Sequence, residues 1–150
     1  MRAMLIKTPA GLRGATPKDQ EAWAKFRRRL ETLKPGAWLR MEWATPRNGP
    51  HHKKMMALLS LVAENSETWN TTEKALVAVK LAAGYFDPHV DPSTGEVLKV
   101  PHSISFDAMG QDDFDAFYSA ALDAILTVIL PQMDRETAER LMEMIVEGWA

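Results

Sequence analysis

The apolar residues of this chain recur mainly at spacings of three and four, the period of one buried face of an α-helix. Five segments carry this pattern, and proline, glycine or other turn-forming residues separate them. The predicted helices cover residues 16–33, 55–65, 70–84, 112–130 and 134–148. We therefore expect most of the chain to be helical, with any sheet built from the short segments in between.

Several of these helices have recognisable ends. The Thr-Pro-x-Asp run that begins at Thr16 predicts a helix start with a capping box and proline at the first helical position. Asn70 with Glu73 predicts a second capping box, at the start of the third helix. Gly84 predicts the end of that helix, and Pro131 ends the fourth.

The segments between the helices supply short strand candidates. Residues 3–8 predict a strand, and residues 11–14 predict a turn-rich loop. Residues 85–90 and 97–104 flank a turn-rich connection, so they predict a hairpin with a loop longer than two residues.

Residues 37–45 alternate between two kinds of side chain, which predicts a half-buried strand. One face holds Leu39, Met41 and Trp43, and the other holds Trp38, Arg40 and Glu42. We expect Trp43 to be buried with its apolar neighbours, as we expect of Trp23 in the first helix. The resulting fold class is α+β: a small sheet of short strands plus a hairpin, packed with about five helices.

Length and composition limit what such a fold can do. A chain of 150 residues with 46% hydrophobic content predicts one domain, covering residues 1–150. The absence of cysteine excludes thiol chemistry, and the lack of a signal peptide or bilayer-spanning run predicts a cytoplasmic protein with no membrane partner. Because the formal net charge is -2, any DNA binding has to depend on a local cluster of positive charge and not on the charge of the whole molecule.

Eight residues at the amino end of the second predicted helix gather five potentially cationic side chains. The run reads Arg47-Asn48-Gly49-Pro50-His51-His52-Lys53-Lys54. Backbone N–H groups at the amino end of a helix lack partners and attract anions, so this composition suits phosphate. A solvated helix start produces the same pattern, and that alternative stays open.

Single-stranded nucleic acid is held by cations that follow the phosphates and by aromatic faces on which the bases stack. The predicted DNA-binding residues are Arg40, Arg47, His52, Lys53, Lys54, Trp69, Lys99 and His102. Further candidates are His51 among the cations and Trp38 and Tyr85 among the aromatic side chains. Packing in the core or at its rim is the alternative explanation for each aromatic residue.

The histidines and aspartates of the chain could serve as metal ligands, but their spacing matches no metal motif. Adjacent His51 and His52 on a helix point about 100° apart and cannot both face one ion. There is also no glycine-rich phosphate loop and no Gly-x-Ser-x-Gly run. We therefore predict no catalytic residue, no metal and no cofactor, with a metal-dependent nuclease as a less favoured alternative.

Several motifs together resemble a family of uncharacterised phage and prophage proteins of about this length, over nearly the whole chain. The motifs are residues 37–45, Arg47-Asn48, residues 52–59, Ser103-Ile104-Ser105-Phe106, Met109 and Phe114. More distantly, the element order is similar to that of the NinB (Orf) recombination proteins of lambda-like phages. In NinB an Asn-Arg-Lys run begins the helix after the second strand, and a Ser-x-Ser segment precedes a helix with an early phenylalanine.

The resemblance to NinB implies a recombination or replication mediator that binds single-stranded DNA without catalysis. It implies a homodimer that works alongside a host single-strand binding protein to load a recombinase. The Asn-Arg-Lys run falls on His52, Lys53 and Lys54, so both cations are kept and the asparagine is replaced. The Ser-x-Ser segment falls on Ser103 and Ser105.

A protein-binding phage factor, such as an inhibitor of a host or defence protein, is the alternative function. The acids along the outer side of residues 134–147 would serve such a role. So would the apolar residues 125–130. The longer apolar segment of residues 122–130 exceeds what one buried helix stripe needs. We also expect this apolar segment, or the neighbouring last helix, to be covered in a homodimer.

Overall fold

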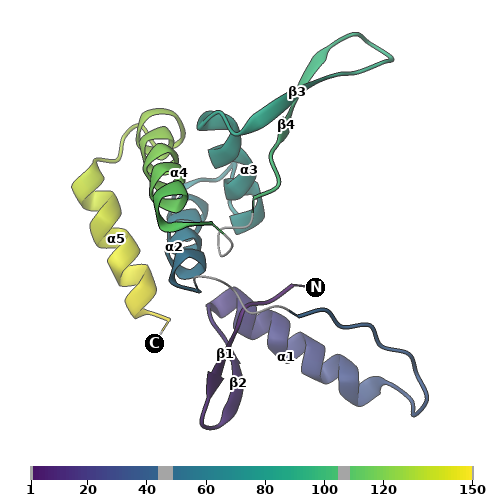
Figure 1. Cartoon of the computed structure of the whole chain (residues 1–150). Coiled ribbons are helices and arrows are strands. Elements are labelled where there is room, and N and C mark those ends of the chain that lie inside the picture. The colour runs from purple at the N-terminus through teal and green to yellow at the C-terminus, as the bar shows by residue number, and fades with distance from the viewer. Residues whose placement is uncertain (1, 44–48, 105–108, 150) are drawn as a thin grey trace. The chain divides into compact units, whose positions relative to one another are not determined.

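A computed structural model describes residues 2–43, 49–104 and 109–149 of the chain. It contains helices and two antiparallel two-stranded sheets, so the α+β class is confirmed (Figure 1). The chain divides into two compact units, Met1–Thr45 with Trp149, and Pro46–Gly148 with Ala150. Whether these units form one domain stays a prediction.

The first unit opens with an antiparallel hairpin of β1 (Leu5–Thr8) and β2 (Gly11–Gly14). The strand at residues 5–8 agrees with the predicted one, but the prediction of a loop over residues 11–14 is wrong. Two residues suffice to turn the chain here, because Gly11 adopts a φ of +117° that other residues rarely reach. The register then pairs Leu5 with Gly14 and Thr8 with Gly11.

Helix α1 (Pro17–Thr32) begins at the predicted capping box, and this box also holds the hairpin. The Thr16 hydroxyl oxygen accepts the backbone N–H of Asp19 at 3.3 Å, and the Asp19 carboxylate accepts the backbone N–H of Thr16 at 3.1 Å. The same carboxylate accepts the backbone N–H of Met4 at 2.9 Å. Asp19 is buried, so the hydrogen bonds that its carboxylate accepts offset the desolvation of the charge.

The aromatic side of α1 packs against β2. The indole N–H of Trp23 donates to the Leu12 carbonyl at 3.1 Å, and the Trp23 ring stacks on Phe26 with centroids 5.5 Å apart. Both rings are half-buried, in agreement with the apolar stripe expected for this helix. Trp23 and Phe26 are therefore partly covered within the first unit, whereas Leu30 on the same side of the helix is 40% exposed.

Residues 37–43 form neither strand nor helix, so the predicted half-buried strand is wrong over this range; residues 44 and 45 lie outside the described part. Trp38 is 100% exposed and Trp43 is 87% exposed. The expectation that Trp43 is buried is therefore also wrong. Alternation shows which side chains would share a face, whereas burial requires a partner strand, and no described segment pairs with these residues.

The second unit is built around α2 (Gly49–Asn65), which packs against α3 (Thr72–Ala82), α4 (Gln111–Ala124) and α5 (Arg135–Glu147) (Figure 1). Among the described residues, no helix is long and apolar enough to cross a membrane. The fully buried side chains include Met55, Leu58, Leu61, Val62, Val79, Phe114, Phe117 and Ile125.

The ends of α3 are set by local hydrogen bonds. Its N-cap is Thr71, whose hydroxyl oxygen accepts the backbone N–H of Lys74, so the predicted capping box of Asn70 and Glu73 is wrong by one residue. At the other end Gly84 has a φ of +84°, as expected of a glycine that ends a helix. The backbone N–H of Tyr85 then donates to the Lys80 carbonyl at 2.8 Å, which completes a Schellman motif.

The predicted hairpin follows α3 and is confirmed as β3 (Phe86–Val90) paired with β4 (Val97–Pro101). The backbone N–H of His102 donates to the Tyr85 carbonyl at 3.0 Å, and the N–H of Asp91 donates to the Glu96 carbonyl at 2.8 Å. Because hydrogen-bonded pairs alternate along an antiparallel ladder, the ring nitrogens of Pro88 and Pro101 face outward, where the ladder needs no N–H donor.

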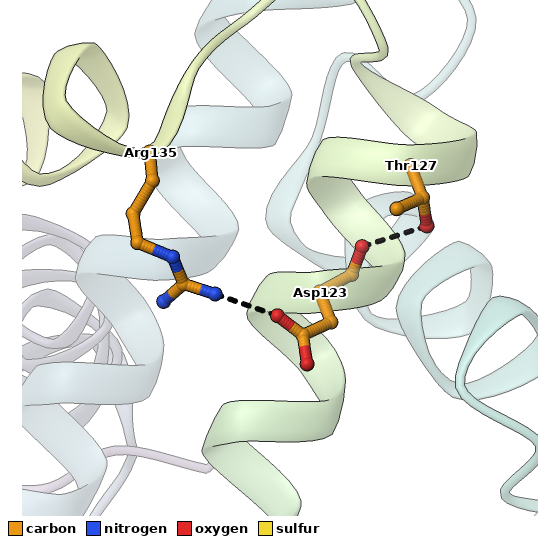
Figure 2. A network of polar contacts seen from close by, with 3 residues as sticks. All are labelled: Asp123, Thr127 and Arg135. Atoms are coloured by element: carbon orange, nitrogen blue, oxygen red, sulfur yellow. Dashed lines mark hydrogen bonds and ion pairs between the residues drawn. The ribbon is translucent and has the colours of Figure 1, made fainter.

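Helix α4 ends earlier than predicted and continues as a π-helical turn, η2 (Ile125–Ile129). The Thr127 hydroxyl donates to the Asp123 carbonyl at 2.7 Å, and the Asp123 carboxylate accepts from the Arg135 guanidinium at 2.6 Å (Figure 2). These contacts join the turn to the start of α5. Ile125 and Ile129 are buried, while Val128 is 62% exposed, so part of the apolar segment is open on this chain.

Asp134 caps α5, and replacing it by alanine should lower the melting temperature at neutral pH. Its carboxylate accepts the backbone N–H of Thr137 at 2.7 Å, and this bond lowers the pKa of Asp134. Because the folded-state pKa is depressed, this stabilisation is present above the unfolded-state pKa and disappears as the pH falls through the folded-state pKa. Thermal melts of parent and Asp134→Ala should therefore differ at pH 7 and converge in acid. Asp134→Asn, which keeps the acceptor oxygen, is the control.

Candidate nucleic-acid interface

The amino end of α2 carries three of the predicted DNA-binding residues. His52, Lys53 and Lys54 lie in its first two turns, where Lys54 is exposed and the other two are half-buried. Arg47 lies outside the described residues. The helix start and its lysines are thus present together, as the sequence predicts, but the arginine of the cluster is not described.

Lys54 lies over an aromatic ring that the sequence pattern does not indicate. Its Nζ is 4.2 Å from the centroid of the Tyr118 ring, a cation–π geometry, and the Tyr118 hydroxyl donates to Met142 Sδ at 3.5 Å. Burial raises the pKa of the Tyr118 phenol, and the Glu139 carboxylate raises it further. Because the ring is held between Lys54 and Met142, it supports the lysine more readily than it offers a free face to a base.

Negatively charged side chains lie near the lysines at the amino end of α2. His51 Nε2 hydrogen-bonds to Gln111 Oε1 at 3.1 Å, while Lys54 contacts Tyr118, so α2 and α4 run parallel with their amino ends together. Carboxylates near the start of α4 complement its dipole but weaken the attraction of this end for phosphate. These exposed carboxylates are Asp112, Asp113 and Asp115.

His51 belongs to the core, so its inclusion among the candidate cations is wrong. Its side chain is buried, and its ring stacks on Phe114 with centroids 3.9 Å apart and planes 3° apart. His51 is therefore buried against α4, whereas Lys54, about one turn further along α2, is exposed. The run of five cations cannot act as one surface.

Trp69 lies beyond the opposite end of α2. The helix rises about 1.5 Å per residue, so Asn65 is roughly 18 Å along the axis from Lys53. Trp69 itself is half-buried, and its backbone N–H donates to the Ser66 hydroxyl oxygen at 3.0 Å. The predicted stacking residue and the predicted lysines are thus not brought together.

The two predicted residues of the hairpin lie on opposite faces. Lys99 Nζ lies 4.9 Å from the centroid of the Phe86 ring, on the face of β3 and β4 that also holds Pro88. His102 Nε2 lies 3.1 Å from Asp87 Oδ1, on the other face. Lys99 and His102 therefore do not converge on one ligand.

Arg40 belongs to the first unit and follows the fully exposed Trp38 by two residues in the sequence. Its guanidinium contacts the Glu42 carboxylate two residues on. The Trp38 ring is open to solvent on both faces, so of the candidate stacking residues it is the most accessible. Tyr85 is half-buried and packs edge-on against Phe117 with centroids 4.6 Å apart, which agrees with rim packing.

The charges of the chain are strongly segregated between the two units. Residues 1–45 contain ten lysines and arginines against four acids, a net charge of +6. The remaining residues contain eight lysines and arginines against sixteen acids, a net charge of −8. The whole-chain value of -2 conceals this difference. A count for each half of the sequence would have found it.

Helix α1 holds five of the ten lysines and arginines of the first unit, together with three of its four acids. Positions seven, three and one residues apart along a helix bring Lys18, Lys25, Arg28 and Arg29 onto one side, and all four are exposed. We call these four residues the α1 cationic stripe. In the described part of the chain, no ion pair involves Lys25, Arg28 or Arg29. The stripe lies away from the Trp23 and Phe26 side of the helix.

Comparisons of the chain with protein-family models, with curated proteins and with solved structures give no match. Within residues 2–43, 49–104 and 109–149, no group of three or more histidine, aspartate or glutamate side chains is placed to hold a metal ion. The functional argument therefore rests on the chemistry of the two units. The first is positively charged and has an exposed indole ring, and the second is helical and negatively charged.

Proposed function

We propose that this chain binds single-stranded DNA without catalysis and assists phage recombination or replication in the host cytoplasm. The observation that carries the proposal is the first unit, where a net charge of +6 accompanies the fully exposed Trp38. Cations that neutralise phosphates and aromatic rings that stack on bases are the two ingredients of single-strand binding. The resemblance to NinB supports the same function, and with it a homodimer and a host single-strand binding protein or recombinase as partners.

The proposal assigns different tasks to the two parts of the first unit. The α1 cationic stripe follows the phosphates, while Trp38 stacks on a base and Arg40 contacts the adjoining backbone. A single strand fits better than a duplex because its bases are accessible to an indole ring. Lys53 and Lys54 have a secondary role, since the acids at the start of α4 offset their charge.

Replacing Arg28 and Arg29 together by alanine should weaken binding to a single-stranded oligonucleotide and flatten its salt dependence. Each phosphate that the protein no longer neutralises reduces the slope of log affinity against log salt by about 0.7, because fewer counterions are released. Fluorescence anisotropy at several salt concentrations measures both quantities. Lys53→Ala with Lys54→Ala removes the same charge and should cost less, and Arg28→Lys with Arg29→Lys should keep the slope. If both alanine pairs reduce the affinity and the salt slope equally, the phosphates do not bind preferentially to the α1 cationic stripe.

Replacing Trp38 by alanine should lower affinity by about 1 to 3 kcal/mol, the usual contribution of a stacked base. It should also remove much of the tryptophan quenching that oligonucleotide addition causes in the parent protein. Folding should be unaffected, because the side chain is fully exposed. Trp69→Ala is the matched comparison, and we expect it to keep both the affinity and the quench. If Trp69→Ala abolishes them and Trp38→Ala does not, base stacking belongs to the second unit.

A protein-binding factor is the second candidate, because the second unit is strongly acidic. Its net charge of −8 and the exposed acids of α5 suit a basic protein surface. Salt dependence separates the two functions. Binding to DNA should fall steeply and log-linearly with salt, whereas a mixed protein interface responds weakly.

A further inference from the structure

Residues 37–43 are exposed and lack a backbone partner. In the described part of the chain, the only backbone hydrogen bond from this segment joins the N–H of Ala37 to the Lys34 carbonyl. Its alternating apolar side chains are open to solvent, with Leu39 50% exposed and Met41 60% exposed. A run of alternating side chains whose backbone N–H and C=O groups are unpaired is suited to form a strand with a partner.

The sequence of this segment is complementary to itself in the antiparallel direction. We infer that residues 39–43 pair with the same residues of a second copy of the chain, in a register centred on Met41. Met41 then lies opposite Met41 of the second copy, and Leu39 lies opposite Trp43. Arg40 lies opposite Glu42, once on each side of the centre.

In this register the facing side chains are complementary on both faces of the paired strands. The apolar face joins leucine, methionine and tryptophan side chains across the pair, and the polar face forms two opposite-charge pairs. In the single chain the Arg40 guanidinium already contacts the Glu42 carboxylate. Pairing therefore exchanges a contact within one chain for the same contact between chains, and neither charge is left alone.

Neighbouring registers are disfavoured by charge. Centring the pair on Arg40 brings two guanidinium groups face to face, and centring it on Glu42 brings two carboxylates together. Like charges directly opposite each other destabilise a strand pair. A second copy is thus the occupant that this segment fits, and charge selects one register for it.

The pairing gives an interface to the homodimer of the proposed function, on which it rests, and it does not depend on DNA binding. Side chains alternate along a strand, so Trp38 and Arg40 share the face opposite to Leu39 and Met41. In the paired state both copies present their Trp38 on the polar face, while Leu39, Met41 and Trp43 of both copies share the other face. Dimerisation is measured without any nucleic acid, so its failure and the failure of DNA binding are separate results.

Cysteine cross-linking tests the register directly, because the parent chain contains no cysteine. Facing residues of an antiparallel pair have Cα atoms about 4.5 to 5.5 Å apart, within the range of a disulfide. Met41→Cys should therefore form a disulfide-linked dimer under mild oxidation. In Leu39→Cys the two thiols would lie about 13 Å apart along the strands, so this control should stay monomeric on a denaturing gel. Equal cross-linking of both variants, or none of Met41→Cys, overturns the inference.

Charge reversal tests the pairing without a covalent bond. Arg40→Glu places acids opposite acids, and Glu42→Arg places bases opposite bases, so sedimentation velocity should show each variant as a monomer where the parent dimerises. An equimolar mixture of the two variants restores opposite charges and should form a heterodimer. Both positions are exposed, and circular dichroism checks that each variant is folded. A parent protein that stays monomeric, or a mixture that fails to associate, contradicts the proposal.

Discussion

Replacing Phe114 by alanine is expected to lower the free energy of unfolding by about 3 to 5 kcal/mol. The Phe114 side chain has no exposed surface, and its ring lies flat on that of His51 with centroids 3.9 Å apart. It also stacks with Tyr118, with centroids 5.9 Å apart. Removing the ring leaves a cavity where α2 and α4 meet, and it takes away the stacking partner of a buried polar side chain.

Urea unfolding followed by the helical circular dichroism signal measures this change. Phe114→Leu keeps much of the volume and should cost clearly less than alanine. Ser119→Ala lies on the exposed side of the same helix and should change the stability little. If Phe114→Ala costs no more than Ser119→Ala, then the contact between α2 and α4 does not contribute to the stability of the second unit.

The helices could be predicted because their signals are local. The period of three and four in the apolar residues identifies α1, α2, α4 and α5, and the Thr16 capping box fixes the start of α1. The third helix is present with its start displaced by one residue. Asn70 and Thr71 are both good caps, and which one is used depends on the geometry of the preceding turn.

The strands are harder to predict because pairing joins segments that the sequence does not mark as neighbours. Residues 37–43 alternate as a strand does, but nothing in the described chain pairs with them. Residues 11–14 contain two glycines, as loops often do, yet a two-residue turn pairs them with residues 5–8. The prediction of the β3 and β4 hairpin succeeds because both strands and their turn lie close together in the sequence.

The sequence indicates which kinds of residue could bind DNA, but it does not indicate which of them lie close together in the structure. The lysines lie at the start of α2 as expected, but Trp69 lies beyond the far end of that helix. Lys99 and His102 both lie on the hairpin, which separates them onto two faces. Arg40 and Trp38 were predicted to lie on a strand that the structure does not contain. Both belong to the first unit, and its net charge of +6 is concealed by the net charge of the whole chain.

Replacing Gly14 by alanine should destabilise the first unit by about 3 kcal/mol, which is large for one methyl group. Gly14 is buried at the end of β2, where the first turn of α1 crosses it. A Cβ atom there would lie 2.2 Å from the backbone N of Gln20 and 2.4 Å from the carbonyl carbon of Asp19. Backbone atoms of a helix cannot move aside as a flexible side chain can. The hairpin must therefore separate from α1, which breaks the bond from the Met4 N–H to Asp19.

Hydrogen exchange resolved by peptide tests this effect where it arises. The amides of residues 4–32 should become less protected in Gly14→Ala, and DNA binding should weaken with them if the α1 cationic stripe carries the phosphates. Gly49→Ala is the matched control, since its added Cβ meets no atom within 4 Å and alanine suits a helix better than glycine. Unchanged protection in Gly14→Ala would mean that β2 does not need to approach α1 so closely. Reduced protection with unchanged DNA affinity would instead show that the hairpin and α1 are not what binds the strand.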